Sequence, residues 1–213
     1  MDHLEKIPTT DPTAAERKQD HIQLAFQSQV ENAFLDKRFS YEPILAAHPT
    51  SPLKSISFLE KEMQTPIWVS SMTGGTEKAY QINANLALAC KTFGMGMGLG
   101  SCRALLESDE RLKDFNFRKI IGDEQPFYAN IGIAQLALLL KDNELFKIDK
   151  LVDKLQADGI IIHVNPLQEW LQPEGDKITE APIKTIQQFL DKTKQKVIVK
   201  EVGQGFGKES LRA

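Results

Sequence analysis

The stretch Gly159-Ile160-Ile161-Ile162-His163-Val164-Asn165 decides the fold class, because an apolar run closed by polar residues is typical of a buried parallel strand. Four similar runs occur, at residues 66–70, 94–99, 126–130 and 197–202. Stretches rich in Ala, Leu, Lys and Gln separate the runs and predict helices at 80–93, 134–140, 148–156 and 183–192. A strand–helix unit of roughly 30 residues that repeats in this way predicts an α/β fold, either a βα barrel or a doubly wound sheet.

The composition excludes several classes of protein. Of the 213 residues, 41% are hydrophobic and 26% are charged, which is ordinary for a globular chain. A net charge of -3 argues against a partner recognised through its phosphate backbone, so we expect no nucleic acid. The charged N-terminus and the lack of an apolar run of about 18 residues predict a cytoplasmic protein with no membrane segment.

Residues 1–60 are predicted to form an N-terminal helical arm, and residues 61–213 the strand–helix repeat. Asp11-Pro12-Thr13 is a helix start signal. Apolar residues recur at helical spacing after it, at Ile22, Ala25, Phe26, Val30, Ala33 and Phe34.

Polar side chains follow every predicted strand. The carboxyl ends of parallel strands open on one rim of a barrel, so residues about 30 apart would converge on one ligand. Lys200 lies inside the run 197–202, where burying a charge costs several kcal/mol unless an anion or a dipole compensates it. We expect Lys200 to face a ligand; the alternatives are a side chain that reaches solvent or one that pairs with a carboxylate.

Two glycine-rich stretches resemble nucleotide-binding motifs without matching them. Residues 94–100 lack the third glycine of a dinucleotide fingerprint, so we expect these glycines to permit close packing of a strand. Residues 203–209 lack the Ser or Thr that a P-loop needs, so we expect a flexible loop there.

The segment 163–176 contains the most informative cluster of polar residues. The strand provides His163 and Asn165, and the predicted loop after it provides Gln168 and Glu169. Glu169 could bind Mg²⁺, which takes one or two carboxylates and keeps other positions for water and phosphate. A solvated glutamate is the alternative.

Six motifs together resemble, in order and spacing, those of the type 2 isopentenyl-diphosphate isomerases: residues 17–21, 70–75, 100–103, 129–132, 163–176 and 199–203. The resemblance implies a TIM (β/α)₈-type barrel, of which this chain holds about five of the eight βα units. It further implies the interconversion of isopentenyl and dimethylallyl diphosphate, in a homo-oligomer. The implied cofactors are reduced FMN as the acid–base group, Mg²⁺ on the diphosphate, and NAD(P)H as the reductant.

The resemblance also implies a role for individual residues. The implied catalytic residues are Gln168, His163 and Asn165. The implied substrate-binding residues are Arg17, Lys18, His21, Arg103 and Gln168. The implied FMN-binding residues are Met72, Thr73, Gly74, Ser101, Asn130 and Lys200. Glu169 would bind the metal ion.

Two features depart from the family pattern. Cys102 stands where the family commonly has Gln, so one hydrogen bond to substrate or flavin is replaced by a packed thiol. The chain also stops after the fifth predicted strand, whereas a complete barrel needs about 250 residues, so we expect a truncated form. The alternatives are an FMN-dependent oxidoreductase of similar barrel, or an inactive fragment that needs a partner chain.

Overall fold

The computed structural model describes residues 23, 24, 27, 42, 44, 45, 54–71 and 73–213. The chain divides into two compact units, residues 1–50 and 51–213. In the first unit Gln23, Leu24 and Gln27 are helical. The rest of the predicted helical arm up to residue 41 lies outside the described residues.

The second unit contains all five predicted strands, and they form one sheet. These strands are β3 (Trp68–Val69), β4 (Gly96–Gly98), β5 (Phe127–Gly132), β6 (Gly159–Val164) and β7 (Val197–Glu201). The four predicted helices are confirmed as α2 (Glu77–Phe93), α4 (Ile133–Lys141), α5 (Phe146–Leu155) and α7 (Pro182–Leu190). Shorter elements are β1 (Ile56–Phe58), β2 (Lys61–Met63), η2 (Arg103–Leu106), η3 (Leu112–Asp114), α3 (Arg118–Ile121), α6 (Pro166–Leu171) and α8 (Lys208–Arg212).

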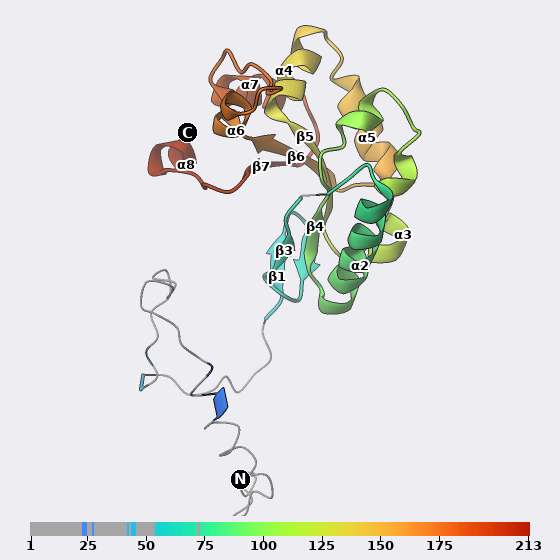
Figure 1. Ribbon diagram of the computed structural model, residues 1–213. Helices are drawn as coiled ribbons and strands as arrows, with labels where there is room; N and C mark the ends of the chain where they lie inside the picture. The colour runs from blue at the N-terminus through green and yellow to red at the C-terminus, as the bar shows by residue number, and fades with distance from the viewer. Residues whose placement is uncertain (1–22, 25–26, 28–41, 43, 46–53, 72) are drawn as a thin grey trace, which may run out of the picture. The chain divides into compact units, whose positions relative to one another are not determined.

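The order of the strands distinguishes the two α/β architectures that the sequence left open. The sheet runs β3-β4-β5-β6-β7, and every neighbouring pair is parallel. Each crossover therefore advances in the same direction, and crossovers of one hand place all the helices on one face. Figure 1 shows a curled sheet with α2, α4, α5 and α7 outside it. This arrangement is consistent with part of a TIM-type barrel, whereas a doubly wound sheet would reverse its strand order.

The hydrophobic core lies between the convex face of the sheet and the helices. Alternate residues of β5 and β6 point into it: Phe127, Ala129, Ile131, Ile160, Ile162 and Val164. The helices contribute residues at helical spacing, among them Ile148, Leu151 and Leu155 of α5 and Ile186 and Phe189 of α7. Each such side chain contributes roughly 1.5–3 kcal/mol on full burial. The residues between them face the other side of the sheet.

The glycines of β4 permit close packing on the concave face, as their spacing predicted. A Cβ at Gly96 would lie 2.0 Å from Cε3 of Trp68. At Gly98 it would lie 2.4 Å from Oγ of Ser71 and 2.5 Å from Cδ1 of Ile161. Any side chain at these positions would displace its neighbours, so glycine is required for this strand to pack.

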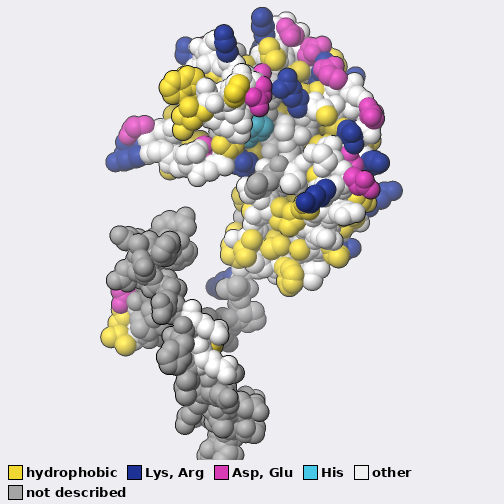
Figure 2. Space-filling view, in the orientation of Figure 1, with side chains coloured by type: hydrophobic (Ala, Val, Ile, Leu, Met, Phe, Trp, Pro, Cys, Tyr) yellow, Lys and Arg dark blue, Asp and Glu magenta, His cyan; other side chains and the backbone are white. Residues whose placement is uncertain are grey.

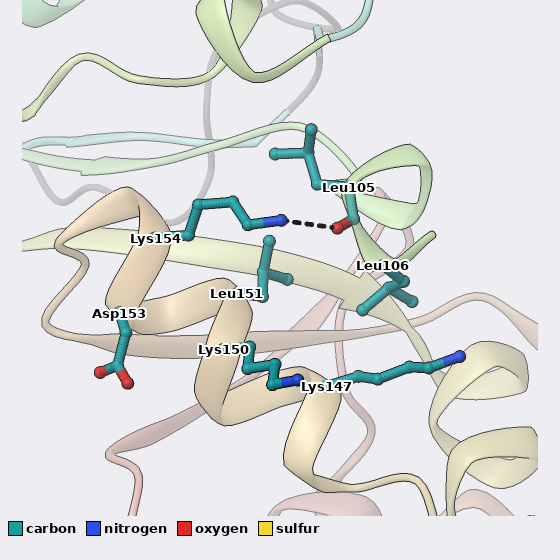
Figure 3. A pocket seen from close by; sticks show the side chains of 7 residues that line it. All are labelled: Leu105, Leu106, Lys147, Lys150, Leu151, Asp153 and Lys154. Carbon is teal, nitrogen blue, oxygen red and sulfur yellow. Dashed lines mark hydrogen bonds between the residues drawn. The ribbon is translucent and has the colours of Figure 1, made fainter. Parts of the chain in front are cut away.

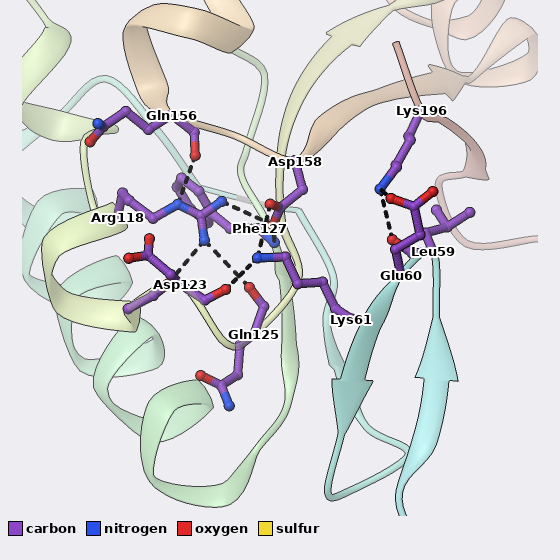
Figure 4. A network of polar contacts seen from close by, with 11 residues as sticks. Leu59, Glu60, Lys61, Arg118, Asp123, Gln125, Phe127, Gln156, Asp158 and Lys196 are labelled. Carbon is purple, nitrogen blue, oxygen red and sulfur yellow. Dashed lines mark hydrogen bonds and ion pairs between the residues drawn. The ribbon is translucent and has the colours of Figure 1, made fainter.

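A hairpin that the sequence did not predict closes the amino ends of the strands. Strands β1 and β2 are antiparallel, and the ring of Phe58 packs against that of Trp68 in a tilted arrangement, with ring centroids 5.0 Å apart. Lys61 of the hairpin pairs at 3.3 Å with Asp158, the residue just before β6. Glu60 of the hairpin pairs at 2.6 Å with Lys196, the residue just before β7. Figure 4 shows these contacts, which fasten the hairpin to the sheet.

Two short helices correct the predicted loops. The segment after β6, predicted as a loop, forms α6, with Pro166 in its first turn. The predicted flexible loop 203–209 ends in helix α8, which starts at Lys208. Within the described part of the chain, no helix is both long and apolar enough to cross a membrane.

Candidate functional site

The structure brings three predicted site residues together at the carboxyl ends of β5, β6 and β7. Nδ1 of His163 lies 2.8 Å from Oδ1 of Asn130. His163 is also the register partner of Lys200 on the neighbouring strand. Residues distant in sequence thus converge on one rim, as the strand-end pattern predicted.

Asn130 determines which nitrogen of His163 carries the proton. Nδ2 of Asn130 donates to the backbone oxygen of Leu99 at 2.9 Å, so its Oδ1 faces the imidazole as an acceptor. Nδ1 of His163 must then be the donor, which leaves Nε2 as an acceptor in the neutral ring. The side chain of Asn130 is buried, with 1% of its surface exposed, so water does not compete for this contact.

The surroundings of His163 favour its neutral form. Burial lowers the pKa of the imidazole below its ordinary value, and the positive charge of Lys200 lowers it further. The carboxylate of Glu169 acts in the opposite direction and is the weaker influence. His163 is therefore an uncharged hydrogen-bonding group near neutral pH.

Lys200 keeps its ammonium group available at this rim. Its Nζ donates to the backbone oxygen of Glu201 at 3.3 Å, and the residue is partly buried. Among the described residues its ammonium forms no ion pair within 4.0 Å, although the sequence allowed pairing with a carboxylate as an alternative. A cation with a carbonyl as its recorded partner can still bind an anionic ligand group.

Glu169 is held by contacts to both of its carboxylate oxygens. Nδ2 of the buried Asn165 donates to Oε1 at 2.7 Å, and the backbone N–H of Asp176 donates to Oε2 at 2.7 Å. Gln168 is exposed, and its Oε1 accepts a longer contact of 3.4 Å from Asn165. No group of three or more metal-binding side chains occurs in the part of the chain that the structure describes. A metal ion at Glu169 would take its other ligands from water and phosphate, as Mg²⁺ does.

The segment after β3 adds the hydroxyl of Ser71, which belongs to the predicted motif 70–75 but was not among the implied FMN-binding residues. Oγ of Ser71 is buried on the concave side and has no hydrogen-bond partner among the described residues. Thr73 donates its hydroxyl proton to Asn83 at 2.8 Å, which fixes the segment to α2. Gly74 packs against Phe115, with a Cβ position 2.4 Å from the ring, and Ser101 after β4 is exposed.

Arg103 lies at the same rim, in contact with Asp176, which in turn binds Gln135, a residue that the sequence did not implicate in this site. Its Nη1 is 3.4 Å from Oδ2 of Asp176, and the same oxygen accepts a hydrogen bond of 2.9 Å from Nε2 of Gln135. These residues are 73 and 41 positions apart from Asp176 along the chain, and no sequence pattern links them. The arginine itself is exposed over 62% of its side chain, so one face remains accessible.

The thiol of Cys102 does not face the ligand side of the rim. The side chain belongs to the hydrophobic core, and Sγ lies 3.4 Å from the backbone oxygen of Gly100. Burial raises the pKa of the thiol to about 12. Cys102 contributes its backbone N–H, which donates to the oxygen of Asn130 at 2.7 Å and ties β4 to β5.

Two hollows lie close to these elements. A groove of about 800 Å³ runs between α6 and the segment that returns past it, lined by Glu169, Trp170, Asp176, Lys177 and neighbouring residues. Figure 2 shows hydrophobic side chains gathered on the surface over α6, where Trp170 is 81% exposed. The second hollow, of about 430 Å³, lies on the outer helical side between η2 and α5 (Figure 3).

The outer hollow is lined by lysines that already have partners. Lys147 pairs with Glu107 and with Glu144, both at 2.7 Å, and Lys154 pairs with Asp109. The outer hollow contains none of the predicted site residues.

Four of the predicted site residues lie outside the described residues: Arg17, Lys18, His21 and Met72.

The fold defines a class: an α/β protein whose curled parallel sheet is consistent with part of a TIM-type barrel, with polar residues gathered at the carboxyl rim. No family model matches the chain. The chain is 39% identical over 210 residues to the isopentenyl-diphosphate delta-isomerase of Rickettsia felis. This match covers 97% of this chain and 60% of that protein. Proteins of the same name from Rickettsia prowazekii and Rickettsia rickettsii (strain Sheila Smith) are 39% and 41% identical, each over 198 residues. These matches cover 91% of this chain and 57% of each relative, so the chain spans about three-fifths of the curated relatives' length.

Proposed function

We propose that this chain provides the catalytic rim of a type 2 isopentenyl-diphosphate isomerase, which interconverts isopentenyl and dimethylallyl diphosphate in isoprenoid biosynthesis. The observation that carries the proposal is the 39–41% identity, over 91–97% of this chain, to proteins named isopentenyl-diphosphate delta-isomerase. The assignment to type 2 is supported by the strand-end motifs and by a parallel sheet whose polar residues meet at one rim.

The concave face has features that fit FMN. The buried Oγ of Ser71 lacks a partner within the described segments, and it lies over Gly98 on the concave face of the sheet. A hydrogen-bonding group of a ligand on this face would supply the missing partner. We propose that Met72, Thr73, Gly74, Ser101, Asn130 and Lys200 hold the cofactor with Ser71. When bound and reduced by NAD(P)H, FMN supplies the acid–base group that this reaction needs.

The rim residues would orient the reactants and stabilise charge. Lys200 would stabilise negative charge on the bound ring, because its ammonium has a carbonyl as its only recorded partner. Nε2 of the neutral His163 would accept a hydrogen bond and fix the orientation of the group above it. Gln168 and Asn165 would confine the isopentenyl group, and the surrounding apolar wall would exclude water.

The diphosphate would bind beside Glu169 and Arg103. Each carboxylate oxygen of Glu169 accepts one recorded hydrogen bond, so each has a lone pair left for Mg²⁺. Arg103 can add a bidentate contact to phosphate from its exposed face. We propose that Arg17, Lys18 and His21 complete the diphosphate site.

The proposal is tested by following the source of the transferred proton. The chain is incubated in D₂O with isopentenyl diphosphate, Mg²⁺ and either reduced or oxidised FMN, and the product is analysed by NMR. We expect dimethylallyl diphosphate containing deuterium only with reduced FMN. Equal turnover with oxidised flavin or without flavin would contradict the acid–base role.

A titration with FMN separates the proposal from its rivals. Perturbed flavin absorbance that saturates, and that weakens in a Ser71→Ala variant, supports a flavin site at this rim. Oxidation of a hydroxy acid with an electron acceptor, without isomerisation, would favour an FMN-dependent oxidoreductase. The absence of a complex at high FMN would favour a domain that functions only with a partner chain.

A further inference from the structure

We infer that Asp176 and Gln135 are positioning residues that aim the Glu169 carboxylate at the rim, an inference that rests on the proposed metal role of Glu169. The backbone N–H of Asp176 donates to Oε2 of Glu169 at 2.7 Å. The side chain of Asp176 is in turn held by Gln135 at 2.9 Å and by Arg103 at 3.4 Å. A chain of contacts thus runs from helix α4 to Glu169.

Helix α6 does not orient Glu169 by packing. None of its six residues is buried, and Trp170 and Leu171 are exposed over 81% and 70% of their surface. A helix this short, without a buried face, has little stability of its own. The direction of the carboxylate must therefore come from the hydrogen bonds to its two oxygens, one from Asn165 and one from Asp176.

The segment that follows α6 passes back along it and places the backbone N–H of Asp176 beside Glu169. A Cβ at Gly175 would lie 1.8 Å from the backbone oxygen of Glu169, so only glycine allows the two segments to come this close. The approach places residue 176 beside the Glu169 side chain. Two carboxylates near one another repel, and the contacts of Asp176 to Gln135 and Arg103 offset that repulsion.

Gln135 is the fixed end of this chain of contacts. It lies in α4 next to Leu136, which is fully buried, and α4 packs on the sheet. Its Oε1 lies over Gly132, where a Cβ would be 2.3 Å away. The side chain therefore has a defined place between β5 and Asp176. The same Asp176 oxygen contacts Arg103. Asp176 therefore contacts both Arg103, the proposed diphosphate-binding arginine, and Glu169, the proposed metal ligand.

The test compares variants of the 213-residue chain by calorimetric titration with Mn²⁺ and inorganic pyrophosphate as probes. Gln135→Leu and Asp176→Ala should each weaken binding by roughly tenfold or more, as loss of a second-layer contact to a metal ligand does. Asp176→Asn keeps a side-chain acceptor for Gln135 and should stay within about threefold of the parent. Gln188→Leu, at an exposed position of α7, is the matched control and should bind like the parent.

Glu169→Gln distinguishes failure of the inference from failure of the proposed function. If Glu169→Gln loses binding while Gln135→Leu and Asp176→Ala do not, the positioning role is wrong and the metal role stands. If Glu169→Gln binds like the parent, or the parent does not bind, the metal role is wrong. Amide hydrogen exchange then decides the positioning: Gln135→Leu should speed exchange at residue 176 by roughly tenfold, and an unchanged rate would overturn it.

Discussion

Replacing Asp158 by alanine tests whether the polar network at the amino ends of the strands stabilises the fold. Asp158 accepts from Nη2 of Arg118 at 2.9 Å and from the backbone N–H of Phe127 at 2.8 Å, and it pairs with Lys61 at 3.3 Å. The Arg118 side chain is only 6% exposed and the Asp158 side chain 15%. Alanine would leave a buried guanidinium without its carboxylate.

The expected loss follows from that burial. Removing one partner of a buried ion pair typically costs about 3–5 kcal/mol. Arg118 retains the backbone oxygens of Gln156 and Gly122 at 2.7 and 3.0 Å, so we expect the lower end, about 3 kcal/mol. For a chain of this size, that loss lowers Tm by about 6–12 °C.

Urea unfolding followed by circular dichroism measures this loss, with the midpoint shifted and the m-value unchanged. Asp153→Ala, at an exposed position of α5, is the matched control and should change the free energy of unfolding by less than about 0.5 kcal/mol. A loss below about 1 kcal/mol in Asp158→Ala would refute the reasoning, because it would show that Arg118 does not need the carboxylate.

Three further outcomes are expected. Gly98→Ala should cost about 1–3 kcal/mol in urea unfolding through overpacking, whereas Gly207→Ala, with no atom near its Cβ position, should cost little; equal losses would contradict the packing argument. The pKa of His163, followed by NMR, lies below its ordinary value, so the histidine stabilises the fold above about pH 6.5 and that contribution is lost as the pH falls through the folded pKa. Lys200→Met should raise the pKa of His163, and an unchanged pKa would show that the Lys200 ammonium does not act on the imidazole. Both thiols should resist Ellman's reagent at pH 8 until the chain unfolds, since burial raises their pKa values, to about 11 at Cys90 and about 12 at Cys102.

The sequence predicted the sheet because its central strands, β5 and β6, are buried and therefore largely apolar, and because shorter apolar runs mark the others. The run 159–165 became β6, Gly159–Val164, and the run 197–202 became β7, Val197–Glu201. The β1–β2 hairpin was missed because its turn residues, Leu59 and Glu60, adopt positive φ of 47° and 71°. A turn with positive φ usually carries Asn or Gly. Leu and Glu at these positions give no turn signal in the sequence.

The candidate site was predictable where a strand end, or the segment directly after it, marked it. Asn130 and His163 end apolar runs, and the parallel register places them on the same face of neighbouring strands, two positions apart. Gln135 and Asp176 stand on a helix and in a loop, and their contact depends on how α6 and its return pack. The helix α6 itself was missed, although Asn165 followed by Pro166 is a start signal, because six residues without a buried face show no periodicity.

The lysines at the two ends of the sheet differ in how far the protein itself compensates their charge. At the amino ends, Asp158 is surrounded by three donors and Lys196 by two acceptors, so those charges are compensated within the protein. At the carboxyl ends, Ser71 has no recorded partner and Lys200 has a single carbonyl. A buried polar group without a partner costs free energy unless a ligand supplies one. The buried hydroxyl of Tyr128, toward the amino ends, also lacks a recorded partner, so hydrogen bonding alone does not separate the two ends. Charge does: Lys61 and Lys196 each pair with a carboxylate, whereas the recorded contact of Lys200 is a carbonyl, so an anionic ligand has more to gain at the carboxyl rim.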